Sequence, residues 1–142
     1  MTYFCDLEIE HIARALVART LPKCAWTHAA HFAAALWLLR ERGLPACQAE
    51  MPALIRAYNE ATGVPNTNIA DFHATISSGS LRAADAWLRA WAAVPLACVL
   101  DEQLAGEYGR CDWPLEYWPG SRLLSRETRR GWGESDLRPL PF

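Results

Sequence analysis

The segment from Thr27 to Gly43 constrains the fold most, because its middle is apolar on almost every side. Residues 29–39 read AAHFAAALWLL, and His31 is the polar side chain among them. A helix without a polar face usually lies at the centre of its domain, covered by other elements. Thr27 is a good N-cap and Gly43 a good C′ residue, so the sequence predicts a central helix between them.

Helical periodicity continues on both sides of this segment. Apolar residues recur at spacings of three and four from Asp6, a good N-cap, to Arg19. Further helices are predicted over Pro45–Thr62, from about Asn68 to Trp91, and over Leu96–Glu107. Pro52 lies inside the first of these three, so that helix either kinks there or begins near Met51.

The remainder of the chain, residues 108–142, lacks this periodicity and is rich in proline, glycine and tryptophan. Its tryptophans have apolar surface to bury, so an irregular tail packed over the bundle is expected, with a mobile lid as the alternative. A length of 142 residues suits one domain. The fold class predicted for residues 1–142 is therefore all-α, a single-domain bundle of about five helices over about 6–107 with a Trp/Pro-rich tail.

Composition excludes several classes of protein. Lys and Arg number 14 and Asp and Glu number 16, a net charge of −2, which argues against a nucleic-acid partner held by bulk positive charge. The N-terminus has no signal-peptide pattern, and no apolar run reaches the roughly 20 residues that cross a bilayer. A cytoplasmic protein with no membrane partner is expected. The five cysteines form no C-x-x-C pair, which disfavours a disulfide framework or a thiolate zinc site.

Three of the four histidines can meet in the bundle. His28 and His31 are three apart and share one helix face. His73 falls on the inward stripe of a later helix, in line with Ser77 and Ser80. The polar run inside that apolar stripe is typical of a cavity wall or of a small buried network.

Three interpretations of the histidine cluster remain open. Three neutral imidazoles with an open position suit one divalent transition metal, namely zinc, iron, copper or nickel. The same side chains can do acid–base catalysis without a metal, because the imidazole pKa lies near 6.5. They can also be structural core histidines.

These residues belong to a pattern that resembles a group of small bacterial all-helical proteins. The motifs that carry it are LPK at 21–23, WTHAAHF at 26–32, ALW at 35–37, IRAYN at 55–59, GVPNT at 63–67, FHATI at 72–76, RGW at 130–132, DL at 136–137 and PLP at 139–141. The resemblance spans nearly the whole chain. It implies a site and no particular reaction.

The site implied by the resemblance has His28, His31 and His73 at its centre, as catalytic residues or as metal ligands. Around them the resemblance implies residues that shape the pocket or bind substrate, namely Tyr58, Asn59, Asn66 and Thr67. Trp26, Phe32 and Tyr58 are expected as apolar walls, and Ser77 as a polar contact. Asn66 and Thr67 suit hydrogen bonding, but Thr67 or Asn68 can equally cap the following helix.

One position departs from the group's pattern. The third motif usually reads aromatic-His-Glu-Thr-Ile, and Ala74 stands here in place of the glutamate. Position 74 lies about 100° around the helix from His73, so a glutamate there could reach the same cavity. Three explanations stay open: an inactivated Glu-to-Ala form, a natural member whose chemistry has drifted, or a glutamate that is not essential.

The function predicted is a small enzyme acting on a small-molecule substrate by hydrolysis, elimination, isomerisation or cyclisation, with secondary metabolism as one setting. The alternative is a non-catalytic protein that binds a small ligand or a metal in the same cavity. A third hypothesis is an interaction module, for which Trp113 and Trp118 would form an exposed aromatic patch.

Overall fold

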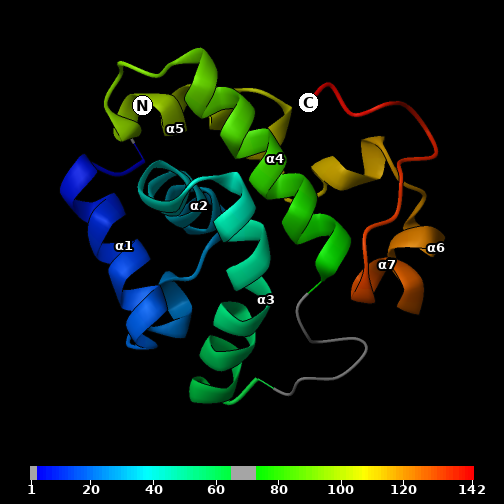
Figure 1. Ribbon diagram of the computed structural model, residues 1–142, viewed down its shortest axis with the longest axis horizontal. Coiled ribbons are helices and arrows are strands. Elements are labelled where there is room, and N and C mark those ends of the chain that lie inside the picture. Colours follow the sequence, from blue (N-terminus) through cyan, green and yellow to red (C-terminus); the bar gives the residue numbers. More distant parts are fainter. Residues whose placement is uncertain (1–2, 65–72) are drawn as a thin grey trace.

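The architecture is all-α, and the described part of the chain forms five helices of ten residues or more and two shorter ones. Figure 1 shows their arrangement. The computed structural model describes residues 3–64 and 73–142, and no strand occurs in these ranges. The helices are α1 (Asp6–Ala18), α2 (His28–Arg42), α3 (Leu44–Ala61), α4 (Ala74–Ala90), α5 (Leu96–Ala105), α6 (Gly120–Leu123) and α7 (Arg126–Arg130). Short 3-10 turns are η1 (Lys23–Ala25), η2 (Glu107–Gly109) and η3 (Trp113–Glu116).

Helix α2 lies at the centre and contacts α1, α3, α4 and α5 (Figure 1). The Thr27 hydroxyl accepts a hydrogen bond from Ala30 N at 3.2 Å, which satisfies one of the free N–H groups of the first turn. Gly43 ends the helix with a φ of 82°, a conformation that glycine adopts at low cost. The predicted central helix and both of its ends are confirmed.

Two predicted helix starts are wrong. Cys5, not Asp6, is the N-cap of α1, and the Asp6 carboxylate instead accepts from Ala97 N at 2.7 Å, in the first turn of α5. Helix α4 begins at Ala74 rather than near Asn68, because the His73 side chain caps it. Both side chains satisfy helix N–H groups, but tertiary contacts decide which helix end each one serves.

Two further features of the helices differ from the sequence prediction, namely the start of α3 and the width of the buried stripe on α1. Helix α3 runs through Pro52 without interruption, so the alternative start near Met51 is wrong. On α1, Leu7 and Val17 continue the apolar spacing but are exposed, while Ile9 is fully buried. The buried stripe of α1 is thus narrower than the apolar stripe in its sequence, because its neighbours α2, α3 and α5 leave Leu7 and Val17 uncovered.

The tail packs on the bundle, as predicted, but it is less irregular than predicted, since it contains η3, α6 and α7. Trp113, Tyr117 and Trp118 are buried, and Trp118 Nε1 donates to Gly133 O at 2.9 Å. The tail lies beside α4, on the side away from α1 (Figure 1). The exposed patch expected of Trp113 and Trp118 for an interaction module is therefore wrong.

None of the helices in the described ranges has the length and apolar character that a bilayer crossing requires. All five cysteines are free thiols, and Cys47 is the buried one.

Candidate functional site

A cavity of about 500 Å³ opens between α2, α3, α4 and the tail. All three predicted histidines line it, together with Trp26, Phe32, Asn59 and Ser77. Its size falls in the range of about 300–1,000 Å³ that is usual for small-molecule sites. The structure thus brings seven of the predicted site residues to one cavity.

His31, on the first turn of α2, has one ring nitrogen engaged and one free. Its Nδ1 lies 2.6 Å from Thr27 O, and since a carbonyl can only accept, Nδ1 carries the proton. Nε2 has no hydrogen-bond partner among the described residues and therefore presents a lone pair. The ring stacks on Trp26, with the ring centroids 3.7 Å apart and the planes 26° from parallel.

The position of this ring in the cavity lining lowers the pKa of His31. Protein surrounds the imidazole on most sides, so burial disfavours its charged form, although the cavity leaves the side chain open to solvent. The hydrogen bond to Thr27 O opposes this shift, and the nearby His28 lowers the pKa further. His31 is thus a neutral base at pH 7.

His28 differs from His31 in the nitrogen that is engaged. Its Nε2 lies 2.6 Å from Tyr108 O, so Nε2–H donates, and in the neutral form of the ring Nδ1 has the lone pair. The His28 ring meets Phe32 edge to face at a centroid distance of 5.3 Å. Two histidines of the cavity therefore each present one acceptor nitrogen.

His73 has both ring nitrogens in use. Nδ1 accepts from Ile76 N at 3.2 Å and so caps α4, and Nε2–H donates to Leu123 O of the tail at 2.8 Å. Burial lowers the pKa of His73, the hydrogen bond to Leu123 opposes this, and the charge of Arg129 lowers it further. His73 holds the start of α4 against the tail and has no lone pair to offer a ligand.

These hydrogen bonds bear on the predicted metal. A three-imidazole site needs one lone pair from each ring, and His73 could supply one only by giving up the α4 cap. No group of three His, Cys, Asp or Glu side chains within residues 3–64 and 73–142 is placed to hold a metal ion. In this arrangement the residues do not fit the tri-histidine site. The metal stays a prediction.

Other predicted site residues fall into three groups. Tyr58 is buried behind the wall, where its hydroxyl donates to Leu21 O at 2.9 Å and its ring meets Trp26 edge to face at 5.7 Å. Ala74 is the first residue of α4 and does not line the cavity. Asn66 and Thr67 lie outside the described residues.

Several lining residues were not predicted. On the bundle side these are Leu16, Ala34, Ala35, Met51, Ile55, Ile76 and Leu81, and on the tail side Cys111, Trp113 and Pro114. Ser80, predicted on the inward stripe with His73 and Ser77, also lines the cavity. The bundle residues carry the helical periodicity that marks buried faces, so that pattern alone does not distinguish them from closed core. No local signal indicates Trp113, because it reaches the cavity only through the fold of the tail.

Comparisons of the chain with known protein families, with curated proteins and with solved structures gave no match. The resemblance described from the sequence motifs therefore stays a prediction, and the cavity is the feature that bears on function.

Proposed function

We propose that the protein is a small cytoplasmic enzyme that binds a small organic molecule in the histidine cavity and removes a proton from it. His31 is the base and His28 a second hydrogen-bond acceptor for the substrate. The observation that carries the proposal is the free Nε2 of His31, on a ring fixed by Thr27 O and Trp26 and facing a cavity of about 500 Å³.

The surroundings of His31 suit a general base. The Nδ1–H bond to Thr27 O fixes the tautomer, and it strengthens when the ring gains a proton and becomes a charged donor. The lowered pKa keeps Nε2 unprotonated at neutral pH. In the reaction the substrate X–H bond breaks, its proton moves to Nε2, and the electron pair stays on the substrate.

The cavity lining indicates what the substrate looks like. Large apolar side chains dominate the walls, among them Trp26, Phe32 and Trp113. The polar contacts offered by residues 3–64 and 73–142 include no carboxylate, ammonium or guanidinium group: they are the imidazoles, Asn59, and the hydroxyls of Ser77 and Ser80. A substrate with an apolar, planar body and one or two polar groups fits these walls.

A probe for a base in an apolar cavity tests this proposal. 5-Nitrobenzisoxazole loses a proton from carbon to the base as its N–O bond breaks, which releases a coloured nitrophenolate and needs no other reactant. We expect the protein to accelerate this elimination and His31→Ala to lower the rate about 100-fold, the usual contribution of general-base catalysis. The rate should rise with pH through a pKa below 6.5 and then level off.

His11→Ala is the matched control, since His11 is exposed on α1 and away from the cavity. Its rate should equal that of the unchanged protein. Equal rates for His31→Ala and the unchanged protein would contradict a base at position 31. Metal content measured on the same tag-free samples, with His28→Ala/His73→Ala beside them, tests the metal prediction separately.

A second candidate is a binding protein without turnover. Ala74 favours it, because no carboxylate occurs at the position where the resembling group has glutamate, and no acidic side chain within the described ranges lines the cavity. Such a protein would bind the benzisoxazole, as seen by quenching of tryptophan fluorescence, yet convert it no faster than His31→Ala does.

A further inference from the structure

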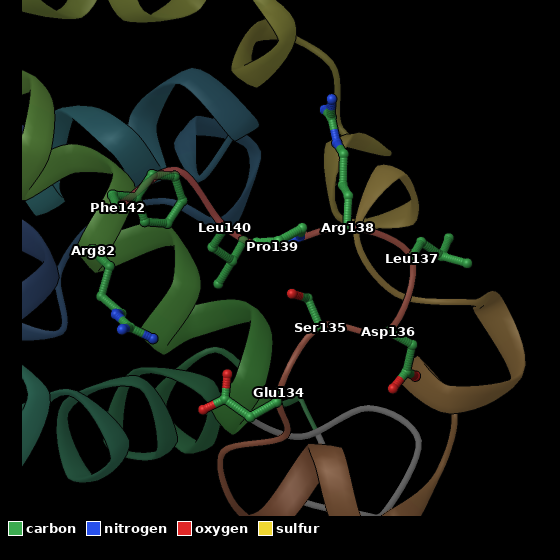
Figure 2. Close-up of a pocket in the computed structure, with 9 residues that line it drawn as sticks. All are labelled: Arg82, Glu134, Ser135, Asp136, Leu137, Arg138, Pro139, Leu140 and Phe142. Carbon is green, nitrogen blue, oxygen red and sulfur yellow. The ribbon is translucent and has the colours of Figure 1, made fainter.

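A second recess, of about 470 Å³, lies between α4 and the C-terminal segment (Figure 2). It shares no lining residue with the histidine cavity. Arg82 of α4 forms one wall, Glu134 and Ser135 lie at its base, and Leu140 and Phe142 line the apolar side. It is therefore a separate site, and nothing in the proposed reaction uses it.

Two of the charged side chains at this recess already have partners elsewhere. The Asp136 carboxylate accepts from Arg122 Nη1 at 2.7 and 2.8 Å. The Arg138 guanidinium donates to Glu107 Oε2 at 2.8 Å, and in Figure 2 it points away from the recess. Neither group is left to bind a ligand.

The Arg82 guanidinium, by contrast, has no carboxylate partner among the described residues. It lies over the Trp132 ring, 4.6 Å from the ring centroid. Trp132 is itself held, because its Nε1–H donates to Glu134 Oε1 at 2.8 Å. The stacking keeps the planar guanidinium of Arg82 in one orientation, and no described residue accepts from its N–H donors, so less entropy is lost when an anion binds.

The other contacts in the recess complement a short amphipathic anion. The Ser135 hydroxyl has no hydrogen-bond partner in the described part of the chain, and it points into the same space as the guanidinium (Figure 2). Phe142 is packed against the core, with its ring 6.0 Å from that of Tyr108, so the apolar wall is anchored. The Glu134 carboxylate in the same recess repels a second negative charge.

We propose that this recess binds a small monocarboxylate with an apolar group. The carboxylate accepts two hydrogen bonds from the Arg82 fork and one from Ser135, and the apolar part lies against Leu140 and Phe142. A bidentate guanidinium–carboxylate pair beside an apolar wall combines charge, geometry and burial in one site. Glu134 makes the site select monoanions over dianions.

Phenylacetate is the probe, and phenylacetamide is its neutral counterpart of the same shape. We expect phenylacetate to shift the indole N–H signal of Trp132 in ¹⁵N-correlated spectra, a signal assigned by its loss in Trp132→Phe. Phenylacetamide and the dianion phenylsuccinate should each bind at least about tenfold more weakly, a difference of about 1.4 kcal/mol.

Arg82→Gln should weaken phenylacetate binding about tenfold or more, and Arg82→Lys should fall between because it keeps the charge and loses the fork. Arg89→Gln is the matched control, since Arg89 is on the same helix but pairs with Asp85 at 2.9 Å. An unchanged spectrum apart from the altered site shows that each variant is folded. Equal affinity in Arg82→Gln, equal binding of phenylacetamide, or shifts confined to the indoles of Trp26 and Trp113 would overturn the proposal.

Discussion

His31 and His73 line one cavity from two different helices, and the α2 wall and the α4 wall use the imidazole in opposite ways. On the α2 wall, His31 donates to the backbone of its own helix start and keeps a free lone pair. On the α4 wall, His73 accepts from Ile76 N and donates to Leu123 O, which leaves neither nitrogen free. The α2 wall has the free nitrogen that the proposed reaction requires, and the α4 wall joins α4 to the tail.

The comparison shows that a histidine in a cavity lining is defined by its hydrogen-bond partners rather than by its place in a motif. Both rings lie in surroundings that lower the imidazole pKa. What separates them is the number of backbone groups that each one satisfies.

The largest difference between the α2 wall and the α4 wall should appear in the rate of benzisoxazole elimination. His31→Gln removes the base and keeps a polar side chain of similar reach, so we expect the benzisoxazole rate to fall about 100-fold. Its free energy of unfolding, measured with urea, should change by less than about 1 kcal/mol, because a single hydrogen bond is lost. A large loss of stability with an unchanged rate would assign His31 to structure and erase the contrast.

A substitution of Thr75, on α4, tests how firmly this helix holds the tail. Its fully buried hydroxyl donates to Gly131 O at 2.8 Å and accepts from Gly133 N at 3.1 Å. Thr75→Val keeps the shape and leaves those backbone groups unpaired, so it should lower the free energy of unfolding by about 1–3 kcal/mol in urea denaturation. Thr75→Ser keeps the hydroxyl and should lose less than Thr75→Val.

His73 itself should affect stability through the α4 cap. We expect His73→Ala to cost about 0.5–2 kcal/mol of unfolding free energy, the usual value for loss of an N-cap. Asparagine is a strong N-cap, so His73→Asn should recover much of that loss. Equal stability of the alanine and asparagine variants would show that the cap contributes nothing measurable.

Acid should weaken the fold through both histidines. Their folded-state pKa values lie below the ordinary value near 6.5, so the folded protein favours the neutral rings. The resulting stability is complete above about pH 6.5 and is lost as the pH falls through the lowered pKa values. Urea denaturation between pH 7 and pH 4.5 should show this decline, and the His73→Asn variant should show a shallower one.

The smallest effect is expected at Ala74. A carboxylate in the first turn of a helix interacts favourably with the helix dipole, so Ala74→Glu should stabilise the protein by about 0.3–1 kcal/mol. The same variant tests the open question about the missing glutamate. If Ala74→Glu also raises the rate of benzisoxazole elimination, and Ala74→Gln does not, a carboxylate at the start of α4 contributes to catalysis.

Much of the site could be predicted from residue spacing. His28 and His31 share a face because they are three apart on one helix, and Phe32 accompanies them because it follows His28 by four positions. Trp26 precedes the helix, at the end of η1, and reaches the same cavity by stacking on His31. Tyr58 is expected from the sequence to line the cavity, and it lies behind the wall instead. Periodicity shows that a side chain points inward but not how deep it lies. Its hydroxyl bonds to Leu21 O, 37 positions away in the chain.

Sequence alone determined the helical bundle, the central place of α2 and the inward direction of the three histidines. These follow from apolar periodicity and capping residues, which act over a few positions along the chain. Only the tertiary structure decided which imidazole nitrogens are free, because the partners of His28 and His73 are carbonyls at Tyr108 and Leu123, 80 and 50 positions away. His31 is the exception, since its partner, Thr27 O, belongs to the preceding turn of the same helix.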